Sequence, residues 1–175
     1  LLIGNHDMAY LKYDFDASRK DYEHAEELYS LYERYKHLLH GCKIIGKTLF
    51  SHAGVSQEWY QEQLQEHPHL QSEQMEHNIN LAIHEQWPSV LVPSPARCGD
   101  RRYSGPLWLD YHEITRGDIS MLECSYFQVF GHTQQLTTGH IVRRPEWASI
   151  DSRCVFEIDP KNPHDTLKAY GTDVV

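Results

Sequence analysis

Residues 1–7 read LLIGNHD, and two later segments share this arrangement, TLFSHAG at residues 48–54 and QVFGHT at residues 128–133. Each is an apolar, strand-like run that ends in a turn of small residues bearing a histidine. The carboxyl ends of strands in an α/β sheet converge on the crevice where ligands bind. We therefore predict an α/β fold in which three strand ends, far apart in sequence, deliver polar side chains to one place.

The metal donors that these turns offer are Asn5, His52 and His132. One amide oxygen and two neutral imidazole nitrogens form a mixed N/O set that suits Mn, Fe or Zn. His6 would stand next to such an ion, where an imidazole can donate a proton to a leaving oxygen. The chain has 13 histidines, so the prediction rests on the context that these motifs share rather than on residue type.

Length and composition restrict the class of protein. The chain of 175 residues suits one domain with a real core, and 16 Lys and Arg against 25 Asp and Glu give a net charge of −9. This charge repels a polyanion, so nucleic acid is not an expected partner. No apolar stretch approaches the roughly 20 residues that span a bilayer, and no signal peptide is evident. Four scattered cysteines indicate free thiols in a reducing compartment, so we expect a cytoplasmic protein without a membrane partner.

The first half of the chain has a helical and then a strand-like pattern. Apolar residues at steps of three and four over residues 25–39 predict one helical face, with Ser18 and Asp21 as a capping box before it and Gly41 as its stop. The segment CKIIGKTLFS then predicts a hairpin that turns at residues 46–47.

The second half begins with helices and ends with strands. Residues 56–66 and 73–86 predict two helices, which together form a helical insertion at about residues 56–87. Residues 88–107 hold too many prolines and glycines for a regular element, so we predict a long ordered loop. Three segments of the last third have strand patterns, namely YFQVFGHT, CVFEID and LKAYG.

The motifs GNHD, SHAG and GHT, in this order, resemble those of the calcineurin-like metallophosphoesterases. Because GHTQ lacks a second histidine, the chain is more similar to the phosphoprotein-phosphatase branch, which includes Ser/Thr phosphatases and diadenosine tetraphosphatases. SGPLWLDY and ASIDSRCVFEID also resemble segments of that branch, so the similarity covers most of residues 1–158. The resemblance implies a sandwich of two mixed sheets flanked by helices, with residues 1–175 as the C-terminal portion of a single metallophosphoesterase domain.

The resemblance also implies roles for individual residues. Asn5, His52 and His132 would bind one metal of a dinuclear pair of Mn, Fe or Zn ions, and His6 would act as the general acid. Asp7 would support the turn rather than bind metal. The implied activity is hydrolysis of a phosphate ester, in a phosphoprotein or a dinucleoside polyphosphate, by a metal-activated water.

Three arginines in the predicted loop offer guanidinium groups for the substrate phosphate: Arg97, Arg101 and Arg102. A guanidinium fork matches a phosphate with two parallel hydrogen bonds. We predict that Arg101 or Arg102 binds the phosphate. The alternative is that both are solvated loop charges or pair with Asp100.

Two blocks that supply the first metal's ligands in the resembled family, D-x-H and G-D-x-x-D-R-G, are not found in this sequence. We expect them to precede Leu1, so that the chain starts at the third core strand and lacks the N-terminal strands. The absent strands would leave sheet edges and apolar faces uncovered. We therefore expect the chain alone to be inactive, and either unstable or self-associating through those edges.

Two other functions remain open on the sequence alone. The chain could be a catalytically impaired binding or regulatory module that kept the fold and lost the first metal site. It could also be a helical interaction domain built on residues 20–87, although that reading leaves the three strand-end motifs unexplained.

Overall fold

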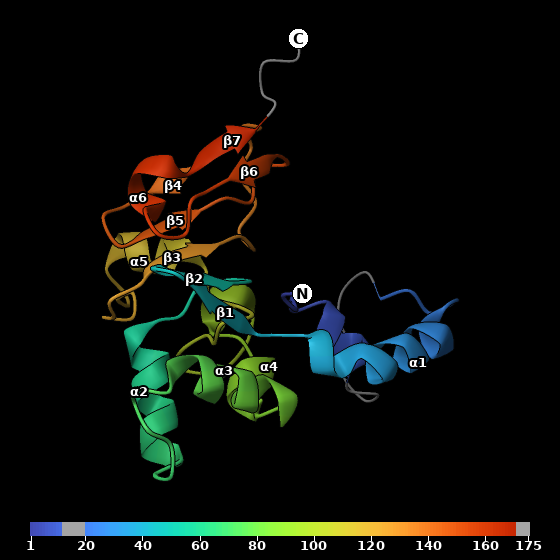
Figure 1. Cartoon of the computed structure of the whole chain (residues 1–175). Helices are drawn as coiled ribbons and strands as arrows, with labels where there is room; N and C mark the ends of the chain where they lie inside the picture. The colour runs from blue at the N-terminus through green and yellow to red at the C-terminus, as the bar shows by residue number, and fades with distance from the viewer. Residues whose placement is uncertain (12–19, 171–175) are drawn as a thin grey trace.

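The computed structural model of the protein describes residues 1–11 and 20–170. It is a mixed α/β structure with a five-stranded sheet, a two-stranded sheet and helices (Figure 1), which confirms the predicted α/β class with two sheets. The order of the larger sheet is β1-β2-β3-β5-β4. Its strands are β1 (Cys42–Ile45), β2 (Thr48–Ser51), β3 (Phe127–Phe130), β4 (Val142–Arg143) and β5 (Trp147–Ser149).

Strand directions in this sheet are mixed. β1 and β2 form the predicted antiparallel hairpin, in which Gly46 takes a left-handed φ of 59°. β2 runs parallel to β3, and β3 runs parallel to β5, whereas β4 pairs antiparallel with β5. Phe50 lies opposite Val129 in the β2–β3 register. The carboxyl ends of β2 and β3 therefore lie side by side.

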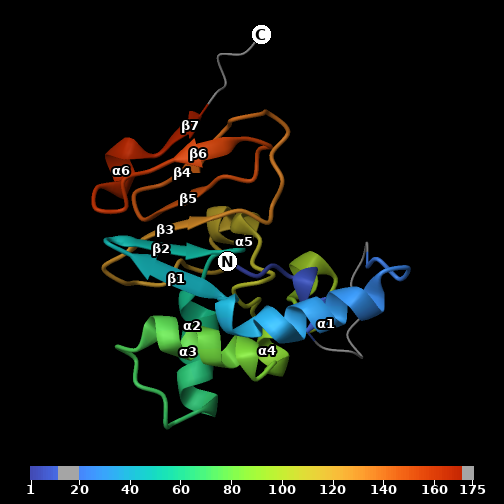
Figure 2. The ribbon, with the colours of Figure 1, turned by 45° about the vertical axis from the view of Figure 1, so that its right-hand side comes forward.

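The two faces of the sheet are covered by different elements (Figures 1 and 2). Leu49 packs on one face into a core with Trp59 and Ile79 from the helices, whereas Val129 packs on the other face with Leu167. Helices α2 (Gln57–Glu66), α3 (Met75–His84) and α4 (Pro88–Leu91) cover the first face, and β6 (Val155–Glu157), α6 (Pro163–Thr166) and β7 (Lys168–Tyr170) cover the second. α2 and α3 agree with the two helices predicted at about residues 56–87.

Helix α3 caps the outer edge of β1 with side chains. The Asn80 Oδ1 atom accepts hydrogen bonds from the Gly41 and Cys42 amides at 2.7 and 3.2 Å, and Asn80 Nδ2 donates to the Cys42 carbonyl at 3.1 Å. Glu76 accepts from the Ile44 amide at 2.9 Å. Without these contacts the backbone groups of β1 would be free to pair with another strand. The sequence analysis predicted such uncovered edges, but the β1 edge is covered. Self-association of the chain stays a prediction.

The predicted helix at residues 25–39 is shorter and less buried than its pattern suggests. α1 (Ala25–Tyr35) is followed by the 3₁₀ turn η2 (Lys36–Leu38), so the helical segment ends before Gly41. All 11 residues of α1 are at least partly exposed, and Leu31 is 50% exposed. In both views α1 lies to one side of the sheet and its covering helices (Figures 1 and 2). Ser18, the predicted cap, lies outside the described residues.

The apolar run at the N-terminus forms less sheet than predicted. Leu2 makes a single parallel bridge with His40, in which the Ile3 amide donates to the His40 carbonyl at 2.9 Å and the His40 amide donates to the Leu1 carbonyl at 2.8 Å. The 3₁₀ helix η1 (Asp7–Tyr10) follows directly. This bridge fixes the GNHD turn relative to the start of β1.

The proline-rich segment 88–107 is mostly irregular, as predicted, but it contains α4 and the 3₁₀ turn η3 (Pro95–Arg97). Both begin with proline, which suits the first turn of a helix. The sequence pattern predicts no helix at α5 (Tyr111–Arg116), whose six residues are too few for a helical period to be recognised. Its start is marked by a capping box between Asp110 and Glu113.

Two further expectations concern the free thiols and the absence of an apolar stretch that could span a bilayer. The four cysteines, all of them in the described part of the chain, are free, and burial raises the pKa of the Cys42 thiol. Over residues 1–11 and 20–170, none of the helices has the length and apolar character of a bilayer crossing.

Asn80→Ala tests the capping of the β1 edge. The variant leaves two backbone amides and one carbonyl without their partner, so we expect the free energy of unfolding to fall by about 2–3 kcal/mol. Chemical denaturation measures this loss, and hydrogen exchange should be faster at the Cys42 amide. Gln61→Ala, on the exposed surface of α2, is the matched control and should change stability by no more than about 0.5 kcal/mol. Equal stabilities of the two variants would contradict the capping role.

Candidate metal centre

The carboxyl ends of β2 and β3 bring two histidines together. His52 follows β2, His132 follows β3, and the Gly131 amide donates a hydrogen bond to the His52 carbonyl at 2.8 Å. This bond continues the parallel register by one step beyond the strands. As a result, His52 Nε2 lies 3.0 Å from His132 Nδ1, and the ring centroids are 4.8 Å apart.

The GNHD turn adds a third polar side chain to this pair. Asn5 is 3% exposed, and its Oδ1 atom lies 2.9 Å from His52 Nε2. Gly4 makes the approach possible, because a Cβ atom at that position would lie 2.9 Å from His52 Cε1. The structure therefore brings Asn5, His52 and His132 together, as the sequence predicts.

Asp7 holds the turn in place, as expected for a supporting residue. Its carboxylate accepts a hydrogen bond from the Gly4 amide at 2.7 Å and another from the Tyr32 hydroxyl at 2.5 Å. Burial and the hydrogen bond to Asp7 raise the pKa of Tyr32, so the phenol stays protonated. Asp7 thus ties the turn that carries Asn5 to helix α1.

His132 has an unusual backbone and an unsatisfied side chain. Its φ is 69°, in the left-handed region that few residues other than glycine adopt. Its Nε2 atom is buried and has no hydrogen-bond partner within the described part of the chain. Strained backbone and unpaired buried polar atoms both cost free energy, and they concentrate where a site binds something.

Both imidazoles are neutral at neutral pH. Burial lowers the pKa of His52 to about 4, and the nearby His6 and Arg97 add to this while Asp7 opposes it. Burial lowers the pKa of His132 to about 3, with further contributions from His52, Arg97 and His6. Neutral imidazole is the form that ligates metal, so neither side chain has to lose a proton before binding.

The separations of Asn5 Oδ1 and His132 Nδ1 from His52 Nε2 fit a shared cation. Ligand atoms about 2.1 Å from an ion and at right angles to one another lie about 3.0 Å apart. The observed distances are 2.9 Å from Asn5 Oδ1 to His52 Nε2 and 3.0 Å from His52 Nε2 to His132 Nδ1. Among the described residues, no group of three or more His, Cys, Asp and Glu side chains is placed to hold an ion. The donor set is therefore two imidazoles and an amide oxygen, with room left in the coordination shell.

A hollow of about 360 Å³ lies at the ends of the strands. Its polar wall includes His52, His132 and Asp151, and its apolar wall includes Phe50 and Ile150. Asp151 follows β5, the third parallel strand, and its carbonyl accepts from the Gln135 amide at 2.7 Å. The two histidines are thus reachable from a cavity rather than sealed in the core.

The remaining predicted site residues lie in different places. His6 is exposed beside Asn5 and lies close enough to affect the pKa values of His52 and His132. Arg101 pairs with Glu62 on α2 at 2.7 Å, not with Asp100 as in the alternative reading of the sequence. The Arg102 guanidinium lies over the Tyr103 ring, 5.0 Å from its centroid. The structure does not bring Arg101 or Arg102 into the polar contacts around the histidines.

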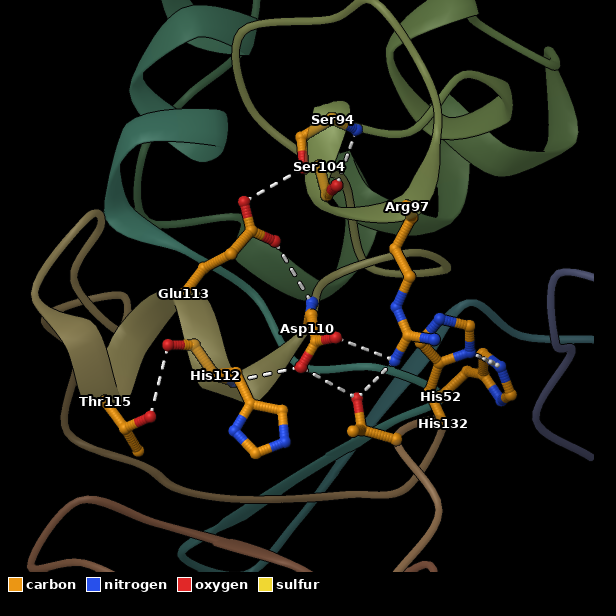
Figure 3. A network of polar contacts seen from close by, with 10 residues as sticks. His52, Ser94, Arg97, Ser104, Asp110, His112, Glu113, Thr115 and His132 are labelled. Atoms are coloured by element: carbon orange, nitrogen blue, oxygen red, sulfur yellow. Dashed lines mark hydrogen bonds and ion pairs between the residues drawn. The ribbon is translucent and has the colours of Figure 1, made fainter.

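Arg97 is the loop arginine that reaches these contacts (Figure 3). Its Nη2 atom donates to Thr133 Oγ1 at 2.6 Å and lies 3.1 Å from Asp110 Oδ2. Thr133 Oγ1 in turn donates to Asp110 Oδ1 at 3.3 Å. The sequence places Thr133 directly after His132 in the GHT motif, but it does not show that Arg97 contacts Thr133.

Comparison of the chain with protein-family models, with curated proteins and with solved structures gives no match in any of the three.

The lowered pKa values predict a pH-dependent stability. Unfolded histidine takes up a proton below about pH 6.5, whereas His52 and His132 in the folded protein stay neutral until about pH 4 and 3. Lowering the pH therefore favours the unfolded state, by about 2 kcal/mol for each histidine between pH 6.5 and 5.

Urea denaturation of the metal-free protein from pH 7 to pH 5 measures this slope. The double variant His52→Gln, His132→Gln should lose most of the pH dependence over that interval. A flat profile for the unaltered protein would show that the folded-state pKa values are not lowered.

Proposed function

We propose that the protein is a metal-dependent phosphoesterase, which hydrolyses a phosphate ester with an ion held by Asn5, His52 and His132. The observation that carries the proposal is the meeting of these three donors, with His52 Nε2 within 3.0 Å of both of the others. They come from three separate turns of the chain, and two of them are partly buried imidazoles that are already deprotonated. The resemblance of GNHD, SHAG and GHT to metallophosphoesterase motifs supports the same function.

Each residue has a role that its position makes possible. Asn5, His52 and His132 bind the ion, while Gly4 and Asp7 fix the turn that aims Asn5. A bound divalent ion supplies Lewis-acid activation of a water and neutralises charge on the phosphate. His6, exposed beside Asn5, would donate a proton to the leaving oxygen.

The substrate is proposed only as a class. A phosphate ester is the ligand, and both a phosphoprotein and a dinucleoside polyphosphate remain open. Phosphoryl transfer asks the protein mainly for positioning and charge neutralisation, which the ion and an arginine provide. Two divalent ions of Mn, Fe or Zn are implied by the family resemblance, and Asn5, His52 and His132 are proposed to hold one of them.

A second function is favoured by the small number of donors. In the described residues, no group of three or more His, Cys, Asp and Glu side chains is placed to hold a further ion. A single ion can bind a phosphorylated ligand, whereas two-metal hydrolysis uses a second ion to stabilise both the attacking and the leaving oxygen. The alternative is therefore a catalytically impaired binding or regulatory module.

Replacing a ligand tests the metal centre. Loss of a residue that only orients a metal ligand already costs about 10–100-fold in affinity, so we expect His52→Ala or His132→Ala to weaken Mn²⁺ binding by at least about 100-fold. Titration calorimetry measures the affinity. His77→Ala, an exposed histidine on α3, is the control and should bind as the unaltered protein does. Unchanged Mn²⁺ affinity in both site variants would refute the centre.

Hydrolysis of p-nitrophenyl phosphate separates the two functions. For a protein that also carries the D-x-H and G-D-x-x-D-R-G blocks, the phosphoesterase proposal expects Mn²⁺-stimulated turnover that His52→Ala abolishes and that His6→Ala lowers by about 10²–10⁴-fold, the usual contribution of a general acid. Mn²⁺ binding by that protein without turnover would favour the binding module.

A further inference from the structure

The surroundings of Arg97 carry a more specific conclusion about the same site, one that rests on the proposed function. Arg97 places a permanent positive charge beside the two histidines. Its Nη2 atom donates to Thr133 Oγ1 at 2.6 Å, Thr133 directly follows His132, and Figure 3 shows the guanidinium next to the two imidazole rings. A divalent cation at this site would therefore face a second cation, and like charges at short range repel each other.

Asp110 only partly relieves this repulsion. Its carboxylate is shared, because Oδ2 lies 3.1 Å from Arg97 Nη2 while Oδ1 accepts from the His112 amide at 2.9 Å and from Thr133 Oγ1. Asp7, whose charge acts on His52 in the opposite sense to Arg97, and Asp151 in the wall of the hollow are the other carboxylates near the site. An anion that lies between the ion and Arg97 would contact a positive charge on each side.

The guanidinium has donors left for such an anion. The hydrogen bonds of Arg97 to Thr133 and Asp110 both use Nη2. Arg97 Nη1, on the opposite edge of the guanidinium from the Nε–Nη2 pair, makes no hydrogen bond or ion pair with the described residues. In Figure 3 the Nη2 side of the guanidinium faces Asp110, and the two imidazole rings lie on its other side. A phosphate group presents several oxygens at the spacing of a guanidinium fork.

The loop that carries Arg97 is held rigidly. Ser94 is 1% exposed, its Oγ donates to Glu113 at 2.9 Å, and its amide donates to Ser104 Oγ at 2.8 Å. Glu113 also accepts from the Asp110 amide at 3.3 Å. Ser94, at the start of the Arg97 turn, contacts Glu113, and the Arg97 side chain contacts Asp110. Both carboxylates belong to the same capping box, so the guanidinium is oriented before any ligand binds.

We infer that Arg97 positions the substrate's phosphate against the cation held by Asn5, His52 and His132, and that Asp110 and Thr133 hold its guanidinium in that orientation. This assignment replaces Arg101 and Arg102 as the phosphate-binding arginines. Arg101 is already engaged with Glu62 and Glu66 on α2, at 2.7 and 3.8 Å.

Binding of Mn²⁺ and of inorganic phosphate tests the inference without relying on turnover. Arg97→Ala should weaken phosphate binding to the Mn²⁺-loaded protein by about 10- to 100-fold, the loss expected for one charge-assisted contact. The same variant should bind Mn²⁺ more tightly in the absence of phosphate, because a repelling charge has gone. Arg97→Lys, which keeps the charge and loses the fork, should leave Mn²⁺ affinity unchanged and recover phosphate affinity only in part.

Calorimetry gives both affinities, and Mn²⁺-induced broadening of the ³¹P signal reports whether phosphate lies next to the ion. Arg116→Ala, which removes an exposed arginine paired with Asp118, is the matched control and should behave as the unaltered protein. A merely structural role for Arg97 would weaken Mn²⁺ and phosphate binding together rather than in opposite directions.

The outcomes separate the two proposals. If the unaltered protein binds no Mn²⁺, the metal centre and this inference both fail. If it binds Mn²⁺ and phosphate, and Arg97→Ala binds phosphate equally well, only the role of Arg97 is overturned. Loss of phosphate binding in Arg101→Ala or Arg102→Ala, with Arg97→Ala unaffected, would return the role to those residues.

Discussion

Parallel pairing of β2 with β3 is the constraint on which the site depends. The register that sets Phe50 opposite Val129 continues into the hydrogen bond from the Gly131 amide to the His52 carbonyl. A shift of this register by one residue would send every side chain of β2 to the opposite face. His52 and His132 are 80 residues apart in sequence. The pairing of β2 with β3 brings them together in space.

The site combines features that are unfavourable for stability when taken singly. A left-handed φ at His132, two buried imidazoles and an arginine beside them all cost free energy in the folded chain. The electrostatic part of this cost would be reduced by a cation and an anion bound together, since the cation pairs with the imidazole nitrogens and the anion with the guanidinium. The protein is thus destabilised at a location where ligands of both signs would stabilise it.

Local patterns in the sequence were enough to predict several parts of the fold. The hairpin at Gly46, the helices α2 and α3, and strand β3 follow from period and turn residues. The convergence of Asn5, His52 and His132 follows from the rule that parallel strand ends meet at one edge of a sheet. The metal role of these three side chains remains a proposal.

Other parts depend on contacts that no local pattern reports. An apolar stripe predicted a helix at α1 but could not show that none of its residues is fully buried, because burial depends on what the rest of the fold places beside it. Which loop arginine lies beside the histidines depends on the path of an irregular loop, which pairs Arg97 with Asp110 and Arg101 with Glu62. Helix α5 was missed because it is too short to show a helical repeat of apolar residues, and the capping box at Asp110 is its main sequence feature.

The capping of β1 by α3 has a consequence for how the protein folds. Asn80 and Glu76 are more than 30 residues away in sequence from the amides that they bond, so the edge is covered only while α3 is docked. A chain with α3 undocked would present a bare strand to neighbouring chains. Docking of α3 therefore protects the hairpin from aggregation as well as stabilising it.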